Sequence, residues 1–257
     1  MKKLLMLGLL AVSVFALMGC GNENNENGNI LRMGTSADYY PFQFIEIVDG
    51  QEVIKGFDID LANYIADALG MELEITDMDF GTLITALRSD RVDMVLASMS
   101  PTEERAAVVD FSNVYYQSNP GWLLAIDNFT SLDELSGLTL GVQTGSLQED
   151  IGNGLIEDGI DVELLVMDRV PDLIQQLLAG RAEAIIVNQL TALGAVQAHS
   201  GLYAIDIIPP VGLGAAIAFQ QGSDLTAQVN EILAELEANG TMARLVEEWL
   251  SGIDLAE

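Results

Sequence analysis

Apolar and polar positions alternate along the chain in a pattern that predicts strands followed by amphipathic helices. The run 30–35 is typical of a first strand, and the run 92–97 is continuous enough for a strand buried on both faces. Apolar residues recur at helical spacing over 57–69, and Gly70 ends that helix. Strands and helices that alternate at this spacing favour an α/β fold with a parallel sheet.

One helix–strand unit occurs twice. The segment 83–98 aligns without gaps with the segment 173–188, 90 positions later. A chance likeness between two helix–turn–strand segments is the alternative, but we interpret the match as one supersecondary unit used in two sheets. Ligands of such sheets lie outside the carboxyl ends of the strands, where Ser98 and Asn188 occupy equivalent positions.

Two extended crossings marked by proline and glycine, 115–121 and 207–214, divide the chain. We predict a first lobe of residues 30–117 plus 210–257, with a second lobe of residues 118–209 inserted into it. Two lobes joined by two strands form a hinge, and the cleft between them can close on a small molecule.

The first 29 residues are not expected to belong to the fold. Two lysines precede an apolar run too short to span a bilayer comfortably, which is typical of a secretory signal peptide, here 1–19. The sequence LMGC at 17–20 resembles the lipobox of bacterial lipoproteins, whose signal is cleaved before a lipid-bearing cysteine. We therefore expect a lipidated Cys20 and a flexible polar tether over 20–29.

Charge and cysteine content narrow the possible functions. The formal net charge is −29, and it becomes −31 when Lys2 and Lys3 leave with the signal peptide. Such a surface argues against nucleic acid and against a polybasic membrane patch, so the lipid is the one membrane contact we expect. Cys20 is the single cysteine, which excludes a disulfide framework. We predict no metal site and no cofactor.

A candidate anion site follows the strand 92–97. Ser100 is a suitable N-cap, Pro101 suits the first helical position, and Glu103 completes a capping box. A helix start attracts anions, and the side chain of Arg105 can reach back to it and grip a carboxylate with two hydrogen bonds. The alternative is a surface arginine paired with a neighbouring acid.

The second unit repeats this arrangement. Gly145 and Ser146 follow the strand 138–142 and precede a helix with its own capping box. Backbone N–H groups are therefore expected to face the strand end there as well.

Five phrases along the chain resemble the solute-binding proteins of ABC importers for polar amino acids. They are GTSADYYPFQF, GFDIDLANYIADALG, FGTLITALRSDRVDMVLASMSPTEERAAVVDFSNVYY, SLDELSGLTLGVQTGS and LTAQVNEILAELEANGTMARLVEEW. The resemblance implies a two-lobe, type II Venus flytrap of the periplasmic-binding-protein kind, held at the extracellular face of the cytoplasmic membrane. It also implies secretion by the Sec pathway and a permease as partner. We expect a monomer.

The resemblance also implies roles for individual residues. Tyr39 and Phe80 look like aromatic walls around the ligand side chain, although each is also typical of core filling. Ser98 and Ser100 look like contacts to the ligand carboxylate, with Arg105 as its bidentate partner. The full set of expected ligand-binding residues is Ser36, Asp38, Tyr39, Phe80, Ser98, Met99, Ser100, Arg105, Gln143, Gly145, Ser146 and Asn188.

Departures from the family pattern bear on the ligand. Asn188 stands where the family usually has an aspartate for the α-ammonium, and an amide oxygen supplies no charge. Ser36 stands where members that bind cationic or amide side chains carry aspartate. Gln143 also lacks charge, while Asp38 either compensates or forms a turn. We therefore predict an amino acid or amino-acid derivative with an uncharged side chain.

Three classes of function are consistent with this sequence. The first is non-enzymatic capture of a solute for an importer. The second is a cyclohexadienyl or arogenate dehydratase on the same fold, which needs a general acid such as Glu103, Glu104 or Asp38, since His199 is expected at the surface. The third is a sensory ligand-binding domain. The absence of a second apolar span or signalling segment leads us to expect capture for transport.

Overall fold

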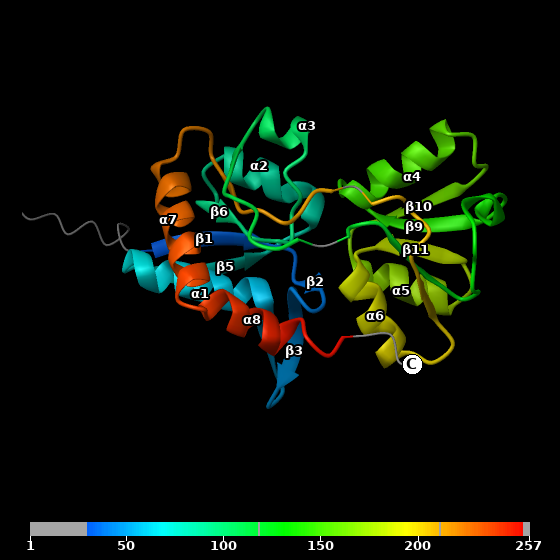
Figure 1. Ribbon diagram of the computed structural model, residues 1–257, viewed down its shortest axis with the longest axis horizontal. Helices are drawn as coiled ribbons and strands as arrows, with labels where there is room; N and C mark the ends of the chain where they lie inside the picture. Colours follow the sequence, from blue (N-terminus) through cyan, green and yellow to red (C-terminus); the bar gives the residue numbers. More distant parts are fainter. Residues whose placement is uncertain (1–29, 118, 211, 254–257) are drawn as a thin grey trace, which may run out of the picture.

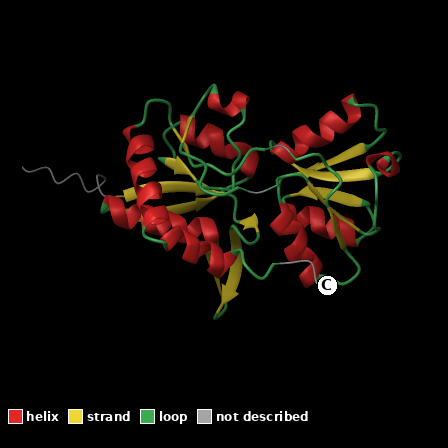
Figure 2. Ribbon diagram, viewed as in Figure 1, coloured by secondary structure: helices red, strands yellow, loops and turns green. Residues whose placement is uncertain are grey.

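The computed structural model describes residues 30–117, 119–210 and 212–253, and it shows two α/β lobes (Figures 1 and 2). The predicted signal peptide (1–19), Cys20 and the tether (20–29) lie outside the described residues. Each lobe has one five-stranded sheet with helices on both faces. The predicted α/β, two-lobe fold is therefore confirmed.

The sheet of the first lobe has the order β5-β1-β6-β13-β7. Strand β1 is parallel to β5 and β6, whereas β13 is antiparallel to β6 and β7. Its strands are β1 (Ile30–Thr35), β5 (Glu72–Asp77), β6 (Met94–Val95), β7 (Asp110–Phe111) and β13 (Ala218–Phe219). Its helices are α1 (Phe57–Leu69), α2 (Leu83–Arg88), α3 (Glu103–Ala106), α7 (Asp224–Ala238), α8 (Thr241–Trp249) and the 3-10 turn η1 (Phe80–Thr82).

The sheet of the second lobe has the order β10-β9-β11-β8-β12, in which β9, β10 and β11 are parallel. Its strands are β8 (Trp122–Ala125), β9 (Thr139–Gln143), β10 (Glu163–Met167), β11 (Ala184–Val187) and β12 (Tyr203–Ile205). Its helices are α4 (Leu147–Glu157), α5 (Val170–Leu178), α6 (Gln189–Ala198) and the 3-10 turn η2 (Leu132–Leu135). The recurring segments form α2 with β6 in one lobe and α5 with β11 in the other.

A small third sheet, which the sequence analysis did not predict, projects from the first lobe (Figure 1). It consists of β2 (Asp38–Tyr39), β3 (Gln43–Val48) and β4 (Gln51–Lys55). Asp49 and Gly50 close the β3–β4 hairpin with positive φ angles of 53° and 80°. An Asp-Gly pair suits the two-residue turn that matches the twist of an antiparallel hairpin.

The two crossings between the lobes run side by side. Tyr116 and Ala215 form an isolated antiparallel bridge, and the backbone N–H of Tyr115 donates to the carbonyl of Ala215 at 2.9 Å. This paired segment joins the two lobes where the sequence predicted a hinge, and it is called the hinge below. No helix in the described ranges is long and apolar enough to cross a membrane.

Several local predictions were wrong. The strand expected over 92–97 is reduced to β6, because the chain turns away from the sheet at Ser98, where φ is 48°. The helix expected to start at Ser100 begins only at Glu103, since Thr102 is its N-cap and accepts a hydrogen bond from the N–H of Arg105.

Candidate ligand-binding site

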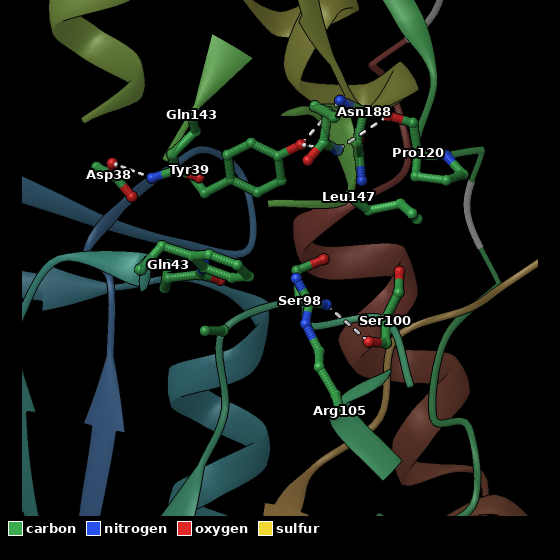
Figure 3. Close-up of a pocket in the computed structure, with 13 residues that line it drawn as sticks. Asp38, Tyr39, Gln43, Ser98, Ser100, Arg105, Pro120, Gln143, Leu147 and Asn188 are labelled. Carbon is green, nitrogen blue, oxygen red and sulfur yellow. Dashed lines mark hydrogen bonds between the residues drawn. The ribbon is translucent and has the colours of Figure 1, made fainter. Parts of the chain in front are cut away.

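A pocket lies between the two lobes, with walls from both (Figure 3). The space between its side chains is about 430 Å³, including the part open to solvent. The residues that line it are Asp38, Tyr39, Gln43, Phe80, Ala97, Ser98, Ser100, Arg105, Pro120, Gln143, Leu147, Gln148 and Asn188.

Arg105 provides the positive charge of the pocket. Its guanidinium donates through Nη1 to the carbonyl of Ser100 at 2.7 Å and through Nη2 to the carbonyl of Gly145, on the other lobe, at 3.0 Å. Its Cζ lies 5.3 Å from the centre of the Phe80 ring. None of the four ion pairs among the described residues includes Arg105.

Burial lowers the pKa of Arg105, while the charges of Asp150 and Glu104 act in the opposite direction. A guanidinium that faces a cavity without a carboxylate in direct contact attracts an anionic group of a ligand. Because α3 has a single turn, this attraction depends on the guanidinium rather than on a helix dipole.

Tyr39 reaches from the first lobe to the second. Its hydroxyl accepts hydrogen bonds from the backbone N–H of Asn188 at 2.8 Å and from Nε2 of Gln148 at 3.3 Å. Figure 3 shows the Tyr39 ring pointing across the pocket toward Asn188. Tyr39 and Phe80 both line the pocket, where the sequence predicted aromatic walls.

Asp38 is a buried carboxylate in the same wall. Its Oδ2 accepts from Nε2 of Gln143 and from the backbone N–H of Val170, both at 3.0 Å and both on the second lobe. Its Oδ1 accepts from the hydroxyl of Ser36 at 2.9 Å. Burial raises the pKa of Asp38 to about 6, partly offset by the hydrogen bonds from Val170 and Ser36 and by the charge of Arg169.

Gln43 is a pocket residue that the sequence analysis missed. Its side chain is 1% exposed, and its Oε1 has no hydrogen-bond partner within the described part of the chain. An unsatisfied buried acceptor in a pocket wall can be satisfied by a donor group of a ligand. The sequence signal that could have identified Gln43 was a polar residue at the start of β3, directly after Phe42.

The sequence analysis also missed Ala97 of the first lobe, and the remaining missed residues of the wall come from the second lobe and its crossing. Gln148 donates from Nε2 to the carbonyl of Pro120 at 2.9 Å, and Leu147 is the first residue of α4. They lie just beyond the Gly145-Ser146 pair that sequence reasoning selected.

Four predicted site residues lie beside the pocket and do not line it. The hydroxyl of Ser36 is used by Asp38, and Met99 is buried in the apolar core of the first lobe. Ser146 caps α4 by accepting from the N–H of Glu149, and the N–H of Gly145 donates to the Glu149 carboxylate at 2.6 Å. Gly145 therefore offers its carbonyl, not its N–H, to Arg105.

Asn188 lines the pocket, but its Oδ1 has another role. It accepts hydrogen bonds from the backbone N–H groups of Leu190 and Thr191, and so caps α6. His199 follows the same helix at its C-terminal end and is not part of the pocket wall.

The lobes also touch outside the pocket. A Cβ atom on Gly145 would lie 3.0 Å from Cα of Gly81 on the opposite lobe. Arg169 of the second lobe forms ion pairs with Asp77 at 2.9 Å and Asp79 at 2.8 Å on the first. These contacts link the two lobes outside the pocket.

Comparison with known proteins identifies the family. The profile of "Bacterial extracellular solute-binding proteins, family 3" matches residues 31–252. The chain belongs to this family. The arginine-binding extracellular protein ArtP of Bacillus subtilis is 42% identical over 260 residues, which covers 98% of this chain and 99% of ArtP.

Solved structures agree with this family 3 assignment. The substrate-binding protein of an amino acid ABC transporter superimposes with a TM-score of 0.81 at 39% identity, over 86% of this chain and 99% of the other. The substrate-binding protein AbpA of Streptococcus pneumoniae, solved with L-arginine, has the same TM-score at 28% identity, over 86% of this chain and 94% of that one. The protein is thus an amino acid solute-binding protein of the ABC-transporter type.

Proposed function

We propose that the protein captures a free α-amino acid in the interlobe pocket and delivers it to the permease of an ABC importer. The observation that carries this proposal is the guanidinium of Arg105 in the pocket wall, out of contact with any carboxylate of the described residues. It would hold the ligand carboxylate against the turn formed by Ser98 and Ser100. Closure of the second lobe would then surround the ligand.

The ligand side chain is a second question. The prediction of an uncharged side chain rests on Ser36 and Asn188, and it stays a prediction. The position of Asp38 supports a different choice, because its carboxylate borders the pocket and lacks a cation in hydrogen-bond contact. The free acceptor on Gln43 adds a second partner for N–H donors.

We therefore propose a cationic amino acid of the arginine type as the preferred ligand. A guanidinium carries five N–H donors and stacks well on aromatic rings, so Asp38, Gln43, Tyr39 and Phe80 suit it together. ArtP, the similar protein from Bacillus subtilis, is named for arginine binding, which supports the same choice.

Calorimetric titration with L-arginine, L-lysine, L-glutamine and L-glutamate tests the proposal. We expect L-arginine to bind most tightly, and Arg105→Ala to weaken binding by about 100-fold or more, because it removes a charge-assisted bidentate contact worth about 3 kcal/mol. Arg88→Ala is the matched control, since Arg88 is exposed in the last turn of α2.

Two results would contradict parts of this proposal. Tighter binding of L-glutamine than of L-arginine would support the sequence-based prediction of a ligand with an uncharged side chain. Equal affinities in the Arg105→Ala and Arg88→Ala variants would remove Arg105 from the site.

We further propose that the protein is not an enzyme. Asp38 is the one acid in the described pocket wall, and its hydrogen bonds to Ser36, Gln143 and Val170 hold it as an acceptor rather than as a proton donor. Incubation with prephenate or arogenate should give no aromatic product. Appearance of such a product would favour the dehydratase alternative.

The targeting predictions also enter here as proposals. Secretion by the Sec pathway, cleavage after residue 19 and lipid attachment at Cys20 would place a monomer on the outer face of the cytoplasmic membrane. Mass spectrometry of the membrane-extracted protein should find a modified N-terminal cysteine, and gel filtration should give the mass of one chain.

A further inference from the structure

Asp58 is a buried carboxylate that the pocket does not use. It lies in the first turn of α1 and its exposed fraction is 0%. Its Oδ2 accepts from the backbone N–H of Ser98 at 2.7 Å, and its Oδ1 accepts from the hydroxyl of Tyr115 at 2.9 Å. Burial raises the pKa of Asp58 to about 7, so the position is costly for a charge. A residue kept at such a cost calls for a specific role.

The Oδ2 atom of Asp58 binds the turn formed by Ser98 and Ser100, called the ligand-facing turn below. Ser98 lines the pocket, and its φ of 48° lies in the left-handed region that residues other than glycine seldom adopt. The hydrogen bond to Asp58 fixes the N–H of this strained residue. It therefore sets the direction in which the rest of Ser98 faces the pocket.

The Oδ1 atom of Asp58 binds Tyr115 in the hinge. Tyr115 is 6% exposed, and its N–H donates to the carbonyl of Ala215 on the returning crossing. That crossing in turn bonds to the ligand-facing turn, because the N–H of Ala216 donates to the carbonyl of Met99 at 2.9 Å. Hydrogen bonds thus form a closed ring that contains the turn, Asp58 and both crossings.

We propose that Asp58 is a positioning residue that couples the ligand-facing turn at Ser98 to the hinge at Tyr115. Rotation of the hinge shifts Tyr115, and the shared carboxylate transmits this shift to Ser98. The coupling is a property of the fold, and its consequence for affinity rests on the proposed function.

The variant Tyr115→Phe tests the coupling without ligand, because it removes the hydrogen bond from Tyr115 to Asp58 and leaves the bond from Ser98 to Asp58 in place. Tyr116→Phe is the matched control: Tyr116 is the next hinge residue, and its hydroxyl makes no hydrogen bond within the described part of the chain. Hydrogen exchange followed by mass spectrometry then reads the amide of Ser98.

We expect Tyr115→Phe to speed exchange in the peptide that covers 96–100 by about tenfold, which corresponds to the loss of one hydrogen bond to a charged acceptor. Tyr116→Phe should leave it unchanged. Equal exchange in both variants would overturn the proposal, and this comparison holds whether or not the amino acid ligand is correct.

Titration with L-arginine tests the consequence for binding. Asp58→Ala should weaken affinity by at least about tenfold, and Asp58→Asn, which retains the shape and one acceptor, should recover part of the loss. If the wild-type protein binds none of the tested amino acids, the proposed function fails. If it binds and the affinities of Asp58→Asn and Asp58→Ala are equal to that of the wild type, the positioning role fails.

Discussion

The polar residues of the pocket differ in how much of their charge and hydrogen-bonding capacity remains available to a ligand. Arg105, Asp38 and Gln43 present a cation, a carboxylate and an unsatisfied acceptor toward the same space. Asn188 lies in the same wall, yet its side-chain oxygen caps a helix. Residue identity alone therefore does not define the site, because the backbone decides which polar atoms remain available.

Asp38→Asn should discriminate between ligand classes. Removal of this charge should weaken L-arginine binding by about tenfold or more, because the ligand guanidinium is stabilised by an opposite charge. The neutral amide of L-glutamine is not, so its binding should change by less than about threefold. Parallel titrations measure this. Asp168→Asn is the control, because Asp168 is exposed and contributes only its backbone carbonyl to Gln143. Equal losses for both amino acids would show that Asp38 has no charge-specific role.

The two buried carboxylates also predict a pH dependence of stability. The pKa of Asp38 is raised to about 6 and that of Asp58 to about 7, both above the unfolded value of 3.8. The folded protein therefore binds protons more readily than the unfolded chain. The resulting contribution to stability is fully present below about pH 4 and is lost as the pH rises through 7. Unfolding by denaturant gives the free energy of unfolding of the wild type and of Asp58→Asn. As the pH rises from about 4 to about 7, this free energy should fall in the wild type relative to the variant. A constant difference would contradict this.

At the scale of elements, glycines allow segments from different parts of the first lobe to pack closely. Gly56 precedes α1 with a φ of 128°, and a Cβ atom there would lie 2.3 Å from the carbonyl oxygen of Phe42. This approach places the start of α1, and thus Asp58, beside the start of β3, where Gln43 lies. The local packing of two elements thereby positions both a wall residue and a hinge contact.

Gly56→Ala should lower the free energy of unfolding by about 3 kcal/mol or more, because the methyl group meets backbone. Gly70→Ala provides the comparison: its φ is 66°, but nothing lies within 4 Å of the added atom. We expect about 1 kcal/mol there, from the backbone conformation alone. Chemical denaturation measures both, and similar losses would mean that the contact with Phe42 is of no consequence.

The sequence predicted the long, periodic elements better than the short ones. Helix α1 was expected over 57–69 and is found at Phe57–Leu69, because its apolar spacing persists over several turns. Strand β6 and helix α3 are too short for periodicity, and there the hydrogen bond from Ser98 to Asp58 and the cap at Thr102 decide the path. The β3–β4 hairpin was missed although Asp49-Gly50 is a recognised turn signal.

For the site, sequence and resemblance placed most of the predicted residues in the wall of one pocket. What they could not supply was the direction of individual polar groups. Gly145 was expected to offer an N–H and offers a carbonyl, since the Glu149 side chain takes the N–H. Such outcomes depend on the tertiary arrangement of neighbouring side chains, which a linear pattern does not contain.

At the scale of the whole molecule, ion pairs cross the cleft and join the two lobes. Arg169 joins Asp77 and Asp79, and its side chain is about 25% exposed. Exposed ion pairs are individually weak and are screened by salt. Closure should therefore be adjustable without changing the pocket.

Arg169→Ala should speed release of L-arginine several-fold while changing the association rate little, because the ion pairs form only when the lobes meet. Stopped-flow measurement of both rates at low and high salt tests this, and the effect of the substitution should shrink at high salt. Arg181→Ala is the control, since Arg181 bonds within its own lobe to Gln176. Unchanged release would indicate that these pairs do not stabilise the closed form.

The facing backbones of Gly81 and Gly145 set the limit of approach between the lobes. A single methyl group on Gly81 would meet the carbonyl of Thr144 at 3.3 Å and act as a wedge between the lobes, next to Phe80 of the pocket wall. The extent to which the lobes approach, and with it the dwell time of the cargo, should therefore depend on one small residue that contributes no side chain of its own to the pocket wall.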